Sequence, residues 1–255
     1  MHVIKAFFIA FSIYSKIPVP QFEWKEEDMR YTLCFFPLVG AVIGIMEWLW
    51  YCLCEKAGVG TLMYAAIGTA IPILISGGFH VDGFMDTMDA LHSYQPREKK
   101  LEILKDPHIG AFSVIMLLLY YLCYLGVYSE LKNEKAFLCF CIGFVLSRAF
   151  SGLAFMVLQP AKETGMLSYF AKTMQKNIVK FVLCVEIAAC IALMFVISTK
   201  AAVFVLLAVL LSFCYYIYKS KKEFGGITGD LAGYFVTVCE LCVVVAAMLA
   251  GIEVL

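Results

Sequence analysis

Long apolar runs separated by short polar connections occupy the chain from residue 31 to residue 252. A bilayer core about 30 Å thick is crossed by about 20 helical residues, and seven runs are long enough to cross it. Each run is expected to be helical, because a segment in lipid must satisfy its own backbone hydrogen bonds. The runs lie near Tyr31–Leu53, Ala57–Ser76, Ile109–Tyr128, Lys135–Leu158, Ile178–Ser198, Ala201–Tyr218 and Ala232–Ile252.

A shorter apolar stretch, Val3–Tyr14, precedes these runs. It is too short to span a bilayer. No small-residue cleavage site follows it, so a signal peptide is not expected. We predict an interfacial or re-entrant segment there. The fold class predicted for residues 1–255 is all-α: one integral membrane domain, a polytopic bundle of about seven transmembrane helices.

Composition agrees with a membrane protein. The chain has 62% hydrophobic and 16% charged residues, whereas a soluble domain has about 25% charged residues. The net charge of zero argues against nucleic acid as a partner. The 11 cysteines lie in the apolar runs or at their edges, with no zinc-type spacing, which indicates packing residues rather than ligands.

Basic residues are distributed unevenly among the connections. Of the 20 Lys and Arg residues, 13 lie in one alternate set of connections and 4 in the other. The positive-inside rule places the richer set in the cytoplasm, with the N-terminus inside and the C-terminus outside. The long polar connections at residues 77–108 and 159–177 then face the cytoplasm, as does the segment KSKKEFGGITGD.

Three aspartates share one helical stripe. Asp82, Asp86 and Asp89 are spaced i, i+4, i+7, which places them on a narrow face of a helix. Like charges so close repel one another, and a divalent cation would offset that repulsion. All-oxygen ligands suit magnesium or manganese. A solvated acidic face is the alternative, and the scarcity of charge elsewhere favours the metal.

Other polar residues of this segment are candidates for the same site. Asp106 is a candidate metal ligand that is also placed to cap the next helix. Lys105 beside it suits a phosphate as a point charge. Gly77 and Gly78 allow close approach of a phosphate. For His80 the spacing leaves three roles open: ligand, base, or an interfacial histidine without catalytic function.

The segment EFGGITGDLAG is a second candidate site. Gly225, Gly226, Thr228 and Gly229 form a flexible turn whose N–H groups suit an anion. It lacks the Gly-Lys-Ser/Thr of a P-loop, and a plain loop is the alternative. Asp230 either caps the last helix or adds a carboxylate.

Four ionisable residues lie inside the runs, where they are costly and usually face the bundle interior. They are Glu47, Arg148, Glu186 and Glu240. Arg148 suits either a pairing with one of the glutamates or a substrate phosphate. The glutamates equally suit a proton relay, and the sequence does not choose between these roles.

Taken together, these segments resemble the cobalamin synthase (adenosylcobinamide-GDP ribazoletransferase) family. The resemblance covers nearly the whole chain. The segments that carry it are KIPVP, FPLVGAVIG, GGFHVDGFMDTMDA, ILKDPHIGAF, SRAF and GGITGD. The aspartate block and GGITGD, in this order and spacing, form the specific pair.

The chain departs from the family pattern at several places. Ala90 stands where a glycine is common, His108 lies in a varied Asp-Ser-Arg-Ile-Gly block, and Thr237 replaces a common glutamate. The family's Gly-x-Gly after the arginine-bearing span reads Gly165-Met166-Leu167. The roles of His108, Thr237 and the 162–170 loop are therefore open.

The resemblance implies a reaction. The ribose hydroxyl of α-ribazole, or of its 5′-phosphate, attacks the phosphorus nearest the cobinamide in adenosylcobinamide-GDP, and GMP leaves. Mg²⁺ on Asp82, Asp86 and Asp89 would hold the diphosphate. One of these aspartates, or His80, would accept the hydroxyl proton. The expected place is a bacterial or archaeal plasma (inner) membrane with the site facing the cytoplasm.

There are three alternatives: a related phosphotransferase, and two proteins of other functional classes. A CDP-alcohol phosphotransferase of phospholipid synthesis also breaks a diphosphate, but its Ala-Arg and final aspartate pair are missing here. An ion-coupled transporter would use the buried glutamates, yet no internal repeat is visible. A non-catalytic scaffold would not need three aspartates on one stripe. Whether the chain forms a homo-oligomer or a complex with other corrinoid-assembly enzymes is not determined by the sequence.

Overall fold

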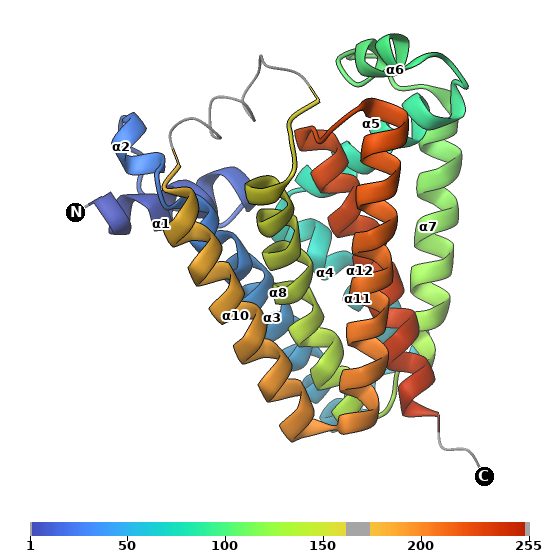
Figure 1. Ribbon diagram of the computed structural model, residues 1–255. Coiled ribbons are helices and arrows are strands. Elements are labelled where there is room, and N and C mark those ends of the chain that lie inside the picture. Colours follow the sequence, from blue (N-terminus) through green and yellow to red (C-terminus); the bar gives the residue numbers. More distant parts are fainter. Residues whose placement is uncertain (1, 162–173, 253–255) are drawn as a thin grey trace.

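The computed structural model describes residues 2–161 and 174–252, and within them the fold is helical with no β-strand. This confirms the predicted all-α bundle (Figure 1). The helices are α1 His2–Tyr14, α2 Glu26–Met29, η1 Thr32–Phe35, α3 Phe36–Ala57, α4 Thr61–Ser76, α5 Phe79–His92, α6 Arg97–Ile103, α7 Ala111–Glu130, α8 Glu134–Val157, α10 Lys176–Ile197, α11 Thr199–Lys219, η2 Ser220–Phe224 and α12 Gly229–Gly251.

Six helices in the described part of the chain are long and apolar enough to cross a membrane. They are η1–α3, α7, α8, α10, α11–η2 and α12, and their bounds agree with six of the predicted runs within a few residues. These helices make the protein a helical membrane protein. Residues 162–173, in the expected connection 159–177, lie outside the described residues.

The second predicted run is not a simple span. Its helix α4 has 16 residues and turns by 95° into α5, and only the two together are long enough to cross. Gly77 and Gly78 make this break with φ angles of 67° and 80°, a region that favours glycine. The expected polar connection 77–108 therefore begins with an ordered helix, α5, which packs along α12 and α7.

The break also has local polar support. The Ser76 hydroxyl donates to the Pro72 carbonyl at 2.7 Å and accepts from the Gly78 N–H at 3.4 Å. Pro72 lies inside α4 and has no N–H of its own, so the backbone of this helix is already short of one hydrogen bond. These contacts satisfy part of the backbone where the helix ends.

Two glycines of α3, Gly40 and Gly44, allow a close contact between helices. A Cβ on Gly44 would lie 2.5 Å from the Cys141 carbonyl oxygen, and one on Gly40 would overlap the Phe144 carbonyl. Small residues allow helix backbones in lipid to approach in this way. The pair α3 and α8 is therefore tightly packed, with α8 at the centre of the bundle.

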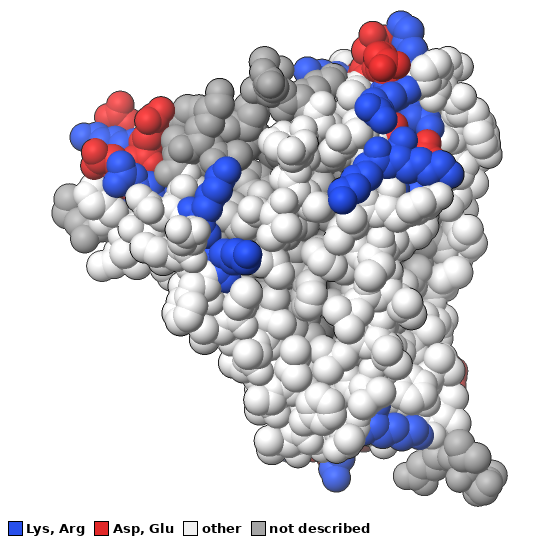
Figure 2. All heavy atoms as spheres, viewed as in Figure 1, with Lys and Arg blue, Asp and Glu red and all other residues white. Residues whose placement is uncertain are grey.

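Charged side chains lie mainly at the two ends of the visible face, with an uncharged band between them (Figure 2). In α10, only 17% of the most apolar 18-residue window is buried by protein, against 78% for α8. A helix so apolar and so little covered by protein is expected to contact lipid. Helix α1 lies at the same end of the bundle as α6 (Figure 1).

Candidate active site

A cavity of about 380 Å³ opens between α1, α3, α5, α8 and α12. Two aspartates from distant parts of the chain, Asp82 and Asp230, lie on its wall, together with Lys105 and Thr228. This size is typical of a small-molecule site. The cavity therefore joins the aspartate block to the GGITGD segment, which the sequence could only treat as two separate candidates.

Two glycines bring the carboxylates together. A Cβ on Gly83 of α5 would lie 2.6 Å from the Asp230 carbonyl oxygen, and one on Gly233 of α12 would lie 2.9 Å from the His80 carbonyl oxygen. Side chains at either position would push the two helices apart. The crossing therefore depends on these glycines, and it holds Asp82 close to Asp230.

The predicted aspartate stripe divides into different environments. Asp82 is exposed in the cavity. Asp86 is half-buried and interacts electrostatically with Asp82, Asp89 and Asp230. Asp89 points to α7, where its carboxylate accepts hydrogen bonds from the N–H groups of Gly110 at 2.6 Å and of Ser113 at 2.9 Å. Asp89 thus caps α7 from a neighbouring helix.

Asp106 does not cap α7, contrary to one of the predicted roles. It is exposed and accepts from the backbone N–H of His108 at 3.0 Å, while the His108 ring lies 2.7 Å from the same oxygen. These hydrogen bonds, the backbone one first, lower the pKa of Asp106. Asp106 does not line the cavity, whereas its neighbour Lys105 does.

The GGITGD segment has two structural roles. Thr228, Gly229 and Asp230 line the cavity, and the Thr228 hydroxyl caps α12 by accepting from the Leu231 N–H at 3.2 Å. Thr228 therefore takes the predicted capping role of Asp230, and its hydroxyl also donates to the Asp230 carboxylate at 3.5 Å. Gly225 and Gly226 do not line the cavity; Gly226 packs on the backbone of residues 159–161.

Known proteins resemble this chain over almost its whole length. The family model for cobalamin-5-phosphate synthase matches residues 6–248. This chain belongs to that family. A protein of Lachnoclostridium phytofermentans named adenosylcobinamide-GDP ribazoletransferase is 44% identical over 250 residues, covering 98% of this chain and 95% of its own. Proteins with the same name from Clostridium botulinum and Clostridium perfringens are 33% and 30% identical, over 94% and 92% of this chain and 95% and 94% of theirs. No solved structure matches the chain.

Membership of the cobalamin-5-phosphate synthase family confirms the resemblance read from the sequence and argues against the transporter and phospholipid alternatives. Of the four ionisable residues on which the transporter alternative relied, Arg148, Glu240 and Glu47 have partners within the bundle, whereas the buried Oε2 of Glu186 has no hydrogen-bond partner among the described residues. Arg148 donates to Glu240 at 2.7 Å and to the Phe144 carbonyl at 2.9 Å. Glu47 accepts from the Tyr128 hydroxyl at 2.6 Å.

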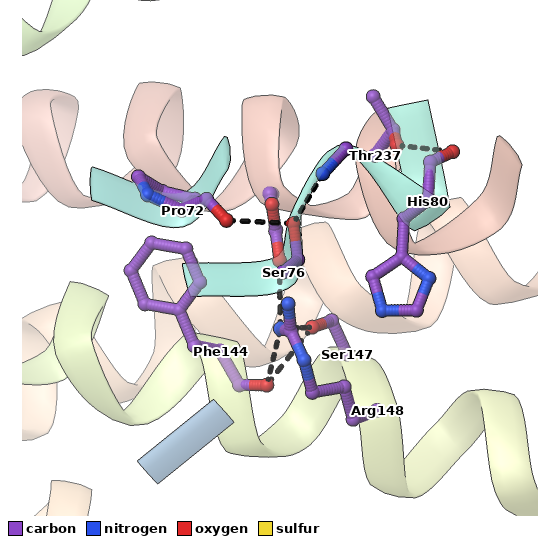
Figure 3. Close-up of polar contacts among 9 residues, drawn as sticks. Pro72, Ser76, His80, Phe144, Ser147, Arg148 and Thr237 are labelled. Atoms are coloured by element: carbon purple, nitrogen blue, oxygen red, sulfur yellow. Dashed lines mark hydrogen bonds and ion pairs between the residues drawn. The ribbon is translucent and has the colours of Figure 1, made fainter. Parts of the chain in front are cut away.

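Arg148 is therefore not on the wall of the larger cavity. It is 1% exposed and lines a second, small cavity of about 20 Å³ with His80 and Thr237. Figure 3 shows Arg148 extending from α8 toward Ser76, with the His80 ring beside it. Thr237, which replaces a common glutamate of the family, donates to the His80 carbonyl at 3.2 Å. The predicted phosphate-binding role of Arg148 has no support in this geometry.

The aromatic wall of the large cavity was not anticipated from the sequence. Tyr14, Phe36 and Phe79 line it together with His80. Tyr14, Phe36 and Phe79 come from three separate helices, α1, α3 and α5. Aromatic residues are frequent throughout the chain, at 15%. No sequence signal distinguishes these three from those that pack elsewhere.

The four aspartates predicted to bind a metal do not lie together as one group of ligands. In the described ranges, no three His, Cys, Asp or Glu side chains form a group that could hold a metal ion. The predicted set of Asp82, Asp86, Asp89 and Asp106 is therefore not assembled as a cage. Mg²⁺, however, often takes only one or two protein carboxylates and completes its shell with substrate phosphates and water. Asp82 and Asp230 fit an ion held jointly with a diphosphate.

Proposed function

We propose that this protein joins adenosylcobinamide-GDP to α-ribazole, or to its 5′-phosphate, with release of GMP. The observation that carries the proposal is the near full-length match to proteins named for this transfer, at up to 44% identity. The cavity with Asp82 and Asp230 supports it, because two carboxylates from separate helices meet there. The reaction is a late step of cobamide biosynthesis.

The chemistry follows from the groups on the cavity wall. The ribose hydroxyl oxygen attacks the phosphorus nearest the cobinamide, and the bond from that phosphorus to the GMP phosphate oxygen breaks. The hydroxyl proton passes to an aspartate of the site that is not fully engaged with the metal, or to His80. Such transfers depend on positioning and charge neutralisation more than on covalent catalysis. Lys105 lies on the wall, where its ammonium group would contact a phosphate oxygen.

We propose Mg²⁺ as the cofactor, held by Asp82 and Asp230 together with the substrate diphosphate. When bound, it would neutralise the phosphate oxygens and the charge that develops on the departing GMP. The half-buried carboxylate of Asp86 lies behind this pair and adds to the negative potential that attracts a cation.

The cytoplasmic face of a bacterial or archaeal plasma membrane is the proposed location of the site. The excess of Lys and Arg in the connections at this end supports that orientation. Sealed vesicles of both orientations test it: product should form from added adenosylcobinamide-GDP only when the cytoplasmic face is outward. Equal rates in both orientations would refute the proposed side.

The proposed reaction is tested with membranes that contain the protein, both substrates and Mg²⁺, with GMP and cobamide measured together. At the Mg²⁺ concentration that is just sufficient for the wild type, Asp82→Asn should lower both products at least tenfold. Glu55→Gln, an exposed carboxylate change on α3 outside the cavity, should retain them. Folded wild-type protein that forms neither product would refute the proposal.

A further inference from the structure

Four rings form a continuous group on one wall of the large cavity. Tyr14 of α1 lies 4.3 Å from Phe36, 5.7 Å from Phe79 and 6.4 Å from His80 between ring centroids, the last pair stacked. Phe36 and Phe79 lie 5.4 and 5.5 Å from His80. All four line the cavity, and Phe79 remains 47% exposed. This group is called the ring cluster below.

The His80 end of the ring cluster lies further along α12 than Asp230 does. His80 is held against Gly233 and Thr237 of α12. Asp230 lies in the first turn of that helix. The rise of about 1.5 Å per residue puts Thr237 about 10 Å further along the axis. A ligand whose reacting group meets the carboxylates can therefore extend an aromatic end toward the rings.

Size and reaction geometry restrict which end of which substrate enters. A cavity of about 380 Å³ holds one small ligand, whereas a corrin macrocycle with its adenosyl and nucleotide groups is much larger. The attacking and leaving oxygens of a phosphoryl transfer lie roughly in line on opposite sides of the phosphorus. Ribazole and GMP must therefore lie on opposite sides, and only one of the two bases can occupy the ring cluster.

The chemistry of the wall selects between those bases. Apolar side chains, among them Ile13, Leu33 and Phe155, also line the cavity. Guanine carries several hydrogen-bond donors and acceptors around its edge, and burying them against apolar side chains leaves them unpaired, which is unfavourable. The benzimidazole base of ribazole has one free ring nitrogen and an otherwise apolar edge, so it suits this wall.

We propose that the ring cluster binds the base of ribazole, so that Tyr14, Phe36 and Phe79 determine the specificity for the acceptor nucleoside. The inference rests on the proposed function. Guanosine and the corrin then lie outside, at the mouth of the cavity, where Lys105 and the carboxylates meet the diphosphate. Flat aromatic ligands gain from stacking on such rings.

The test uses the full-length protein in membranes. The Michaelis constants for ribazole and for adenosylcobinamide-GDP are measured separately for Phe79→Leu and Phe36→Leu. The matched control is Phe112→Leu, since Phe112 is also 47% exposed but stacks on His92 away from the cavity. Both cavity variants should raise the ribazole constant about tenfold, as expected for the loss of one ring contact. They should leave the corrinoid constant within about twofold.

Binding without turnover is the second measurement. Radiolabelled ribazole should bind the purified wild-type protein and be displaced by unlabelled ribazole but not by GMP, and Phe79→Leu should weaken it. A rise in the corrinoid constant alone, displacement by GMP, or no ribazole binding would each overturn the inference. The proposed function is tested separately. It fails if the wild-type protein forms no product, whether or not ribazole binds.

Discussion

Asp89 offers the sharpest test of how the aspartate stripe is used. The sequence predicts a metal ligand, whereas the structure places its carboxylate on the N–H groups of Gly110 and Ser113, at the start of α7. The first turn of a helix leaves several N–H groups without partners. Gly110, the N-cap residue of α7, has no side chain to supply one. Asp89 supplies the missing acceptors from α5.

The expected loss can be worked from these two bonds. A hydrogen bond to a charged group contributes about 1.5–3 kcal/mol, and partial exposure of Asp89 reduces that. Asp89→Ala should therefore lower the free energy of unfolding by about 3 kcal/mol. Asp89→Asn keeps an oxygen acceptor and should lose about 1 kcal/mol. Asp82→Ala, in which an exposed cavity residue is changed, should leave stability nearly unchanged.

The assay is thermal unfolding of purified protein in detergent, together with the Mg²⁺ dependence of activity per folded molecule. Asp89→Ala should unfold about 5–10 °C earlier and, below that temperature, need no more Mg²⁺ than the wild type. Gly110→Ala should also destabilise, because its Cβ would lie 2.5 Å from the Asp89 carboxylate oxygens. An Asp89→Ala protein of unchanged stability that needs much more Mg²⁺ would refute the capping role.

Three further predictions concern other carboxylates. Arg148→Ala should lower the free energy of unfolding by about 3–5 kcal/mol, because it leaves Glu240 buried without its partner. The double variant Arg148→Met with Glu240→Leu should recover much of this loss in the same thermal assay, and no recovery would contradict the prediction. Asp28 is fully buried, and burial raises the pKa of its carboxyl group. Hydrogen bonds with His2 and Lys5 outweigh this effect, so the pKa is lowered overall. The ionised Asp28 carboxylate therefore stabilises the fold above the unfolded pKa of about 3.9, and this stabilisation is lost as pH falls through the lower folded pKa. The difference in melting temperature between wild type and Asp28→Asn should narrow below about pH 4, and a difference independent of pH would contradict this prediction. Chelation of Mg²⁺ should stop GMP release. Asp82→Asn should raise the Mg²⁺ concentration needed for half-maximal GMP release at least tenfold, whereas Asp106→Asn should change it less than twofold. Equal effects of the two substitutions would support the four-aspartate metal site instead.

The sequence by itself determined the class of fold. Apolar runs of about 20 residues have one structural solution in lipid, because every backbone group must be paired within its own segment. Six of the seven predicted runs are single helices at nearly the expected positions. The family could also be read directly, since the aspartate block and GGITGD keep their order and spacing.

Tertiary structure decided how those motifs are used. Asp82, Asp86 and Asp89 share one helix face, so the sequence predicts one role for them, but the neighbours of α5 differ along its length. Asp82 meets the cavity, whereas Asp89 meets the first turn of α7. The partner of Asp82 in the cavity is Asp230, 148 residues later in the chain. Its proximity depends on the Gly83–Gly233 crossing, which no local pattern encodes.

The same distinction explains Arg148 and the ring cluster. A lone arginine in an apolar run signals a buried partner, but whether that partner is Glu47, Glu186, Glu240 or a phosphate depends on helix packing, and the structure pairs it with Glu240. Phe36 and Phe79 are two of 21 phenylalanines, and only the packing of α1, α3 and α5 brings their rings together on one wall. Periodicity in a sequence fixes which residues share a helix face, whereas the contacts between helices fix what each face meets.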